Sequence, residues 1–290
     1  MSIVINALNN SLIKLDQNTP CVTFYCVGHT FRMGLYDGTQ ITNSHKWDGR
    51  IFYSYNKRNW YEWNGVVTDP SWIIYLCGID NTHLSYDVES SPTRASIHFF
   101  PPYNVSVDPG CDITCVGDLA TLLDFRKYSS GGTLVAPDNS FRAAFWDCRG
   151  LVSVEKIGFT HIGRYAFYGA FYECRDLKTP PALSAIALEN NCYGSMFGHC
   201  YALECLPKLS AQNIPDAAYR AMFAYSNIKL SSSQTGEYQY PFRVPYSGSG
   251  TFGINALKEM VIGTQGTYTG DAEGTIQGNT TYYTDKPLVE

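Results

Sequence analysis

The middle of this chain repeats every 26 residues, and this period constrains its fold more than any other feature. One column of the repeat holds Phe145, Phe171, Phe197 and Phe223, and no insertion breaks the phase. A period between about 20 and 50 residues marks one supersecondary unit per repeat, which buries its apolar side only by stacking on its neighbours. The aligned columns predict a core made of Phe141, Phe145, Cys148, Leu151, Phe167, Phe171, Cys174, Leu177, Tyr193, Phe197, Cys200, Leu203, Tyr219 and Phe223.

The two halves of each repeat have different patterns. Tyr193, Phe197 and Cys200 follow one another at steps of four and three, which predicts a short helix of about three turns. Leu206 follows with Pro207, and proline ends a helix because it lacks a backbone donor, so this half is expected to be extended. One helix and one extended segment per 26 residues fit the length and layout of a leucine-rich repeat.

Two segments carry a resemblance to a known family. His161–Phe167 and Cys192–Leu203 resemble the BspA-like leucine-rich repeats, which occur in surface proteins of gut bacteria and in virion proteins of their phages. The pattern is interrupted at Ser226, where the cysteine column ends, and at Ile228, where the leucine column slips by one residue. The segment 219–230 is therefore expected to be a degenerate last repeat. The family is defined by architecture, so the resemblance implies no catalytic residues.

Segments outside the repeats resemble what surrounds them in the phage-type members. Gly117–Leu123 is similar to the start of a first repeat, and Asn279–Thr284 is similar to a terminal motif. Tyr53–Asn56, with Trp60 and Trp63, and Trp72–Gly78 resemble the small β domain that precedes such repeats.

Residues 1–106 are expected to form an antiparallel, sandwich-like β domain. Short aromatic and β-branched runs are separated by turn signals such as Asp37–Gly38, Asp48–Gly49 and Asn64–Gly65. The runs are Cys21–Phe24, Phe31–Tyr36, Arg50–Tyr55, Trp60–Trp63, Trp72–Cys77 and Arg94–Phe100. The predicted fold is thus mixed α and β: this domain, a repeat solenoid over 107–230, and a Gly/Ser/Thr/Tyr-rich cap over 231–290. The cap contains one helix candidate at Ile254–Val261.

Aromatic content points to binding surfaces. The chain has 22 tyrosines, and aromatic residues make up 14% of it. For each ring the core is the expected place, but tyrosine and tryptophan also supply rigid contact area at interfaces. The β region holds the candidate attachment surface, namely Phe52, Tyr53, Tyr55, Trp60, Trp63, Trp72 and Tyr75.

Charge and patterning exclude several classes of partner. The net charge is −5 with no basic run, which argues against nucleic acid and anionic membranes as partners. No run approaches 18 apolar residues, and Met1–Asn10 lacks the basic and apolar parts of a secretory signal. This favours a virion protein assembled in the host cytoplasm over an exported adhesin.

Cys148, Cys174 and Cys200 are expected to be buried free thiols. Equivalent positions of stacked helices lie about 8 to 10 Å apart, which is too far for a disulfide.

Residues that could carry chemistry each have a structural alternative that we prefer. Gly248, Gly250 and Gly253 spell G-x-G-x-x-G, with Glu273 about 20 residues on, but no βαβ unit precedes them, so a glycine loop is favoured. Ser195 lacks the strand-to-helix elbow of a hydrolase nucleophile. A structural zinc site usually requires four ligands, but no second pair with ligand spacing follows either of the close cysteine pairs. The acids that could form a carboxylate pair for glycoside hydrolysis all lie in turn sequences. These last candidates are Cys21, Cys26, Cys111 and Cys115 for a metal, His161 and His199 as scattered histidines, and Asp37, Asp48, Asp69 and Asp87 as acids.

We therefore expect a non-enzymatic structural or adhesive protein of a bacteriophage virion, such as a head fibre, a capsid decoration or a tail-associated protein. Its repeats would present a surface for host attachment or for mucosal glycans. Other virion proteins and sister chains are the expected partners, with a trimer as the first guess by analogy to phage fibres. No cofactor, metal, nucleic acid or membrane insertion is expected. The alternative is an exported BspA-like adhesin on a bacterial cell surface, and a glycan-active enzyme is a distant third.

Overall fold

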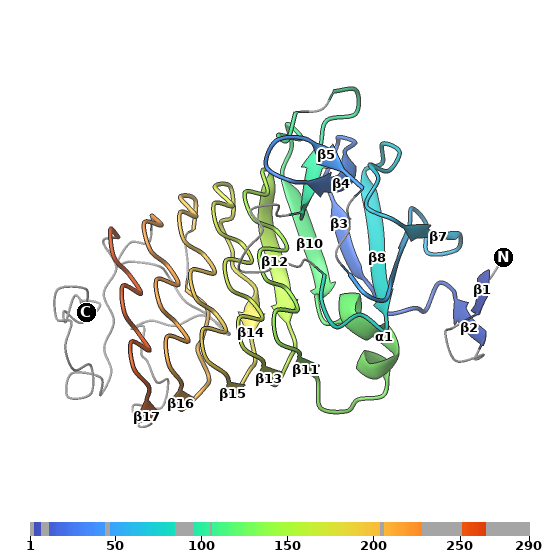
Figure 1. The fold of residues 1–290 in the computed structure, drawn as a ribbon. Coiled ribbons are helices and arrows are strands. Elements are labelled where there is room, and N and C mark those ends of the chain that lie inside the picture. Colours follow the sequence, from blue (N-terminus) through green and yellow to red (C-terminus); the bar gives the residue numbers. More distant parts are fainter. Residues whose placement is uncertain are drawn as a thin grey trace.

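The protein is rich in β-structure, with several sheets and one short helix in the part of the chain that the structure describes (Figure 1). This computed structural model describes residues 3–6, 12–43, 47–84, 95–104, 106–203, 206–227 and 251–264. Asp87, Gly248, Gly250, Glu273, the terminal motif at 279–284 and most of the expected cap at 231–290 lie outside the described residues.

The largest sheet has seven strands in the order β14-β12-β10-β3-β8-β6-β7. Strands β3, β8, β6 and β7 pair antiparallel, as the sequence predicts, and β10 is antiparallel to β3. On the other side of β10, strands β12 and β14 pair parallel. In chain order the strands are β3 (Val22–Tyr25), β6 (Arg50–Ser54), β7 (Trp60–Trp63), β8 (Ile73–Ile79), β10 (Ile113–Asp118), β12 (Leu151–Ile157) and β14 (Ala182–Leu183).

A smaller antiparallel sheet, in the order β5-β4-β9, packs on the inner face of the large one. Its strands are β4 (Arg32–Tyr36), β5 (Ile41–Thr42) and β9 (Ser96–Phe100). The Phe99 ring of β9 lies 5.2 Å from the Phe24 ring of β3, between ring centroids. A separate hairpin, β1 (Ile3–Asn6) with β2 (Leu12–Leu15), lies at the N-terminal end (Figure 1).

The helix α1 (Thr121–Ser129) packs against β8 on the outer face of the large sheet. Its backbone comes so close to Gly78 that a Cβ at that position would overlap the Leu122 carbonyl. Asn81 fixes the contact by donating from Nδ2 to the carbonyl oxygens of Arg50 (2.9 Å) and Leu122 (3.0 Å). Phe125 of the helix then covers a second apolar cluster on this face, apart from the main core.

The repeats form a stack of parallel coils beside the large sheet (Figure 1). Five segments have the same backbone pattern and are called coils one to five here: residues 139–148, 165–174, 191–200, 217–226 and 255–264. Short parallel strands lie along one edge of the stack, in a sheet ordered β11-β13-β15 and in the pair β16-β17. They are β11 (Val135–Ala136), β13 (His161–Ile162), β15 (Ala187–Leu188), β16 (Asn213–Ile214) and β17 (Thr251–Phe252).

The coils are not helices, which corrects the expected three-turn helix in each repeat. Alternate N–H groups donate to the next coil, as from Phe141 to the Ala166 carbonyl (2.7 Å) and from Phe145 to the Ala170 carbonyl (2.9 Å). The N–H groups between them donate three residues back, as from Ala144 to Phe141 (3.1 Å). Every fourth residue has a positive φ, such as Ser195 (53°) and His199 (59°). A turn that repeats every four residues puts side chains i and i+4 on one face, so over two turns its pattern matches that of a helix.

The segment 251–264 adds a fifth coil to the stack, where the sequence predicted a helix at Ile254–Val261. The backbone N–H of Tyr193 in coil three donates to the Ala218 carbonyl of coil four, and the backbone N–H of Tyr219 in coil four donates to the Ala256 carbonyl of coil five. The step along the chain to coil five is longer than the earlier steps, and this insertion hides the coil from a fixed period. Leu257 and Val261 take the two ring columns of the core and are at most 3% exposed. The fifth coil covers the fourth, which is the part of the expected cap that the structure describes.

The strands before the expected boundary at residue 106 and the repeats after it share one sheet and one apolar core. Strand β10 joins the antiparallel strands on one side to the first repeat on the other. The same apolar core runs through both, and the Phe24 ring of β3 lies 6.2 Å from the Phe145 ring of coil one. The N-terminal strands therefore close the open end of the stack.

Candidate functional surface

Inside the stack, the side chains of the repeat columns are structural. Phe145, Phe171, Phe197 and Phe223 lie in one column of nearly parallel rings, with centroids 5.3, 5.7 and 5.6 Å apart. A second column runs through Phe141, Phe167, Tyr193 and Tyr219 at 4.8, 5.9 and 6.0 Å. Every residue that the sequence assigns to the repeat core is at most 1% exposed. These side chains hold the coils together and are closed to ligands.

The cysteine column is also internal. Cys148, Cys174 and Cys200 are free thiols, as the sequence predicts. The Cys174 thiol donates to the Phe145 carbonyl (2.9 Å) and the Cys200 thiol to the Phe171 carbonyl (3.1 Å) of the preceding coil. Burial raises the pKa of these thiols, so they stay neutral.

Outside the stack, ring side chains line up across the coils. We call Trp146, Tyr172, His199, Tyr201 and Tyr225 the aromatic stripe. The Trp146 and Tyr172 rings stack at 4.2 Å, Tyr172 meets His199 at 5.2 Å, and His199 stacks on Tyr225 at 4.9 Å. The Tyr201 hydroxyl lies 2.9 Å from Nδ1 of His199. Tyr201 and Tyr225 are 46% and 48% exposed, so the stripe opens to solvent on coils three and four.

Glycines let these rings lie flat on the stack. A Cβ at Gly169 would come within 2.9 Å of the Trp146 ring, and one at Gly198 within 2.8 Å of the Tyr172 ring. Each glycine is in the coil that follows its ring. The ring therefore rests on the backbone of the next coil, where a side chain would have displaced it.

Charged pairs flank the stripe on the first two coils. Asp147 pairs with Arg149 at 2.8 Å, and Glu173 pairs with Arg175 at 3.5 Å, at equivalent positions of the repeat. The Arg175 guanidinium also lies over the Tyr201 ring, 5.8 Å from its centroid. The equivalent positions of the third repeat are His199 and Tyr201, so the surface changes from charged to aromatic along the stack.

A hollow of ≈ 240 Å³ lies at the sheet end of the stripe, and we call it the junction pocket. Its walls come from the β4 turn, from β9 and from coil one, namely Tyr36, Asp37, Gly38, Ser96, His98, Trp146 and Asp147. His98 is 1% exposed, and its Nε2 lies 2.9 Å from the Trp146 carbonyl oxygen and 2.9 Å from the Ser96 hydroxyl. Burial lowers the pKa of His98 to about 4, so the imidazole is neutral near pH 7.

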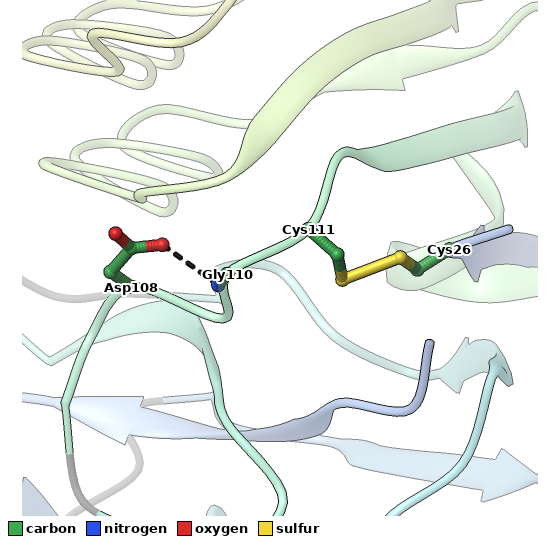
Figure 2. The surroundings of a disulfide bond; sticks show 4 residues. All are labelled: Cys26, Asp108, Gly110 and Cys111. Atoms are coloured by element: carbon green, nitrogen blue, oxygen red, sulfur yellow. Dashed lines mark hydrogen bonds between the residues drawn. A yellow bond between two sulfur atoms is a disulfide. The ribbon is translucent and has the colours of Figure 1, made fainter. Parts of the chain in front are cut away.

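A wider hollow of ≈ 550 Å³ in the β region is lined by Gly28, His29, Thr30, Trp72, Pro102 and Pro109. It adjoins a disulfide between Cys26 and Cys111, which Figure 2 shows with Asp108 and Gly110 on the segment leading to Cys111. The bond joins residues 85 positions apart. Cys26 and Cys111 were weighed as metal ligands, and the disulfide removes both from that role.

The structure corrects part of the candidate attachment surface. Phe52, Trp60 and Trp63 are at most 2% exposed, because they pack within the β region itself. Tyr53, Tyr55 and Tyr75 are half-buried, and the Tyr55 hydroxyl donates to the Asp69 carbonyl. Burial raises the pKa of Tyr55 to about 12. Trp72 is 59% exposed, so among these candidates it offers the largest free fraction.

Two of the acids that the sequence placed in turns, Asp37 and Asp48, bind backbone and hydroxyl groups of loops. Asp37 accepts hydrogen bonds from the backbone N–H groups of Thr39 and Gln40, both at 2.9 Å. Asp48 accepts from the N–H (2.8 Å) and the hydroxyl (2.6 Å) of Thr82. The hydrogen bond from the Thr39 hydroxyl is the main cause that lowers the pKa of Asp37. At Asp48 burial raises the pKa, but the bonds from Thr82 outweigh it and lower the pKa overall. Both acids are therefore ionised at neutral pH and hold loops in place.

Among the described residues, the two histidine candidates lie in different places. His161 lies 3.7 Å from Glu189 on the strand edge, whereas His199 belongs to the stripe. Ser195 has a positive φ in coil three, and a Cβ at Gly253 would meet the Asp216 side chain and backbone. Among the residues that the structure describes, no group of three or more His, Cys, Asp or Glu is placed to hold a metal ion.

Neither the comparison with protein-family models nor those with curated proteins and solved structures find a match for this chain. The described residues contain no helix long and apolar enough to span a membrane.

Proposed function

We propose that this chain is a non-enzymatic structural and adhesive protein of a bacteriophage virion, in which the stacked coils are a BspA-like leucine-rich-repeat solenoid. In this proposal the protein is a head fibre, a capsid decoration or a tail-associated protein. It is assembled in the host cytoplasm and displayed on the virion surface. The stack presents a binding face to the host surface or to mucosal glycans.

The aromatic stripe is the observation that supports the binding role. Tyrosine and tryptophan supply large rigid contact area with little loss of conformational freedom, and their polar tips still form hydrogen bonds. Carboxylate and guanidinium groups such as those of Glu173 and Arg175 lie beside the rings. Sugar rings have apolar C–H faces edged by hydroxyl groups, so a surface of this composition suits them.

Replacing Tyr201 and Tyr225 together by alanine tests the binding role. Both side chains are about half exposed and contact His199, so their loss removes much of the free ring area at moderate cost in stability. We expect the double variant to lose at least about tenfold in affinity for whichever glycan the native chain selects from an array, equal to about 1.4 kcal/mol. Tyr103→Ala is the matched control, because that tyrosine is 96% exposed and lies off the stripe. Equal glycan binding by the native protein, the double variant and Tyr103→Ala would contradict the proposal. The proposal would also be contradicted if the native protein bound no glycan on the array.

We assign attachment to the particle to the β region. Sister chains are proposed to form a homo-oligomer, with a trimer as the first guess. Because β10 hydrogen-bonds to β3, a fragment lacking the N-terminal strands would lose a sheet partner. Surface variants of the full chain are therefore the better test. Trp72→Ala should reduce decoration of particles that lack the protein, or lower the mass measured by light scattering, while Tyr103→Ala should change neither.

The disulfide between Cys26 and Cys111 favours a second candidate, an exported bacterial surface adhesin. Disulfides persist mainly in oxidising compartments, whereas a protein assembled in a cytoplasm is kept reduced until release. Neighbouring genes separate the two: capsid, portal and tail genes support the virion protein, and lipoprotein or secretion genes support the adhesin. Polysaccharide degradation by the purified chain would instead support an enzyme and contradict both.

A further inference from the structure

Two free thiols lie at the second apolar cluster, on the outer face of the large sheet: Cys77 in β8 and Cys21 directly before β3. Strands β3 and β8 pair Thr23 with Tyr75 and Val22 with Leu76, so the next step of the register places Cys21 opposite Cys77. Residues directly opposite in an antiparallel pair point to the same face, with Cα atoms about 4.5 to 5.5 Å apart. Disulfides need Cα atoms about 4.4 to 6.8 Å apart, and the usual spacing of such opposite pairs lies within this range.

The surroundings give the two thiols different roles. Cys77 is 0% exposed among Phe52, Trp60 and Phe125, whereas Cys21 lies at the border of this cluster and is partly exposed. Burial raises the pKa of both thiols, and for Cys77 the nearby sulfur of Cys21 raises it further. Lys57 opposes the effect of burial at Cys21 through its charge and a hydrogen bond. An oxidant from solvent therefore meets Cys21 first.

We infer that Cys21 and Cys77 form a redox-active dithiol, in which a hydroperoxide oxidises Cys21 and Cys77 then closes a cross-strand disulfide. In the first step the Cys21 thiolate attacks a peroxide oxygen. An S–O bond forms, the O–O bond breaks, and the leaving hydroxide or alkoxide takes up a proton. In the second step the Cys77 sulfur attacks the sulfenic sulfur, the S–O bond breaks, and the released hydroxide leaves as water with the Cys77 proton. Each sulfur loses one electron, and the peroxide gains the two.

The cysteine column of the coils provides an internal comparison. Cys148, Cys174 and Cys200 are 0% exposed, and each lies in a different coil. The thiols of Cys174 and Cys200 already donate to backbone carbonyls. We expect them to stay reduced under conditions that link Cys21 to Cys77.

Peptide mapping of the full chain tests this inference. The native protein is treated with hydrogen peroxide, its free thiols are alkylated after unfolding without reductant, and the digest is analysed by mass spectrometry. The expected product is a Cys21–Cys77 linked peptide, with Cys148, Cys174 and Cys200 alkylated. Cys77→Ser should stop at a Cys21 sulfenic acid that dimedone traps, whereas Cys21→Ser should leave Cys77 alkylated.

Lys57→Met tests the assignment of the first step, since it removes the ammonium group and keeps a side chain of similar length. It should slow formation of the linked peptide several-fold without changing which cysteines are joined. The inference is overturned if both thiols of the native chain remain free at peroxide concentrations that oxidise an exposed cysteine in a reference peptide. It is also overturned if Cys21 is linked to a cysteine other than Cys77. The native chain alone decides these outcomes, whether or not a variant folds.

Discussion

The coils and the β region both bury large aromatic rings, but they pack them differently. In the coils, each ring rests on the ring one repeat away, as Phe171 rests between Phe145 and Phe197. In the β region, Phe99 of the small sheet meets Phe24 and Phe31, which are distant in sequence and follow no period. The first arrangement extends by adding copies, because every coil offers the next one the same surface. The second ends at its own edges.

The two regions also differ in the kind of surface they form. Inside the stack, each repeat must place a matching side chain at the same position. The outer positions can differ between repeats, as in the column of Asp147, Glu173, His199 and Tyr225. The β region instead makes hollows where loops from different strands meet, as at the junction pocket. A periodic core thus leaves the outer positions of the stack free to vary.

The largest expected effect comes from interrupting the ring column. Phe171→Ala should lower the free energy of unfolding by about 3 to 5 kcal/mol, because the ring is fully buried between two others and the coils cannot close the cavity. Urea denaturation measures this cost, and hydrogen exchange should show the loss of protection first in the coils next to the cavity. Ile186→Ala is the control, since Ile186 is 67% exposed. A cost below about 1 kcal/mol for Phe171→Ala would show that the stack does not depend on this column.

The contact between the two regions should make stability depend on pH through His98. Its pKa is about 4 in the folded protein and about 6.5 in an unfolded chain, so between these values only the unfolded chain binds the proton. Stability is therefore unaffected by His98 above about pH 6.5, falls as the pH drops from there towards 4, and loses about 3 kcal/mol in all.

His98→Gln keeps a donor for the Trp146 carbonyl but does not titrate, so its unfolding free energy should fall less steeply over this range. His161→Gln is the control, because His161 lies at the strand edge and is partly exposed. If His98→Gln retains the full pH slope, another group is responsible.

Sequence reasoning succeeded where the fold is periodic. The 26-residue columns identified the buried rings of the stack, because identical neighbours require matching side chains at equal spacing. It failed on the backbone between those rings, since a turn with a left-handed residue every fourth position resembles a helix over so short a span. Coil five was missed because the insertion before it moves Leu257 and Val261 out of phase with the earlier columns.

The candidate surface was harder to predict than the core. Trp146 and Tyr172 are one period apart, but the next position in that column is Gly198, so the aromatic column ends there in the sequence. Only the structure shows that Gly198 makes room for the Tyr172 ring. The disulfide and the junction pocket both join segments that only the folded chain brings together. Conversely, Phe52, Trp60 and Trp63 were assigned to a surface because aromatic type alone does not say which face of a strand is covered.

Two glycine substitutions compare how tightly each region is packed. At Gly78 a new Cβ would overlap the Leu122 carbonyl of α1, and backbone there cannot move without separating the helix from the sheet. At Gly198 it would instead meet the Tyr172 ring at 2.8 Å, and that ring can swing outwards. We expect Gly78→Ala to cost about 2 to 3 kcal/mol and Gly198→Ala about 1 kcal/mol in urea denaturation. The reverse order would mean that the stripe is the more rigid of the two.

The smallest expected effect compares the same substitution in both regions. Cys200 donates its thiol hydrogen to the Phe171 carbonyl, and the next position in its column is naturally Ser226, whose hydroxyl donates to Phe223. Serine at 200 therefore has an acceptor, and Cys200→Ser should cost less than about 1 kcal/mol. Cys115 of β10 is buried to the same degree but, in the described part of the chain, donates to no carbonyl, because strand carbonyls are used by the neighbouring strands. A hydroxyl buried there without a partner should make Cys115→Ser cost about 1 kcal/mol more than Cys200→Ser, measured as the difference between the two unfolding free energies. Equal costs would show that the coils accept polar atoms no better than the sheet, and that the serine in the fourth coil is tolerated only because Ser226 lies near the end of the stack.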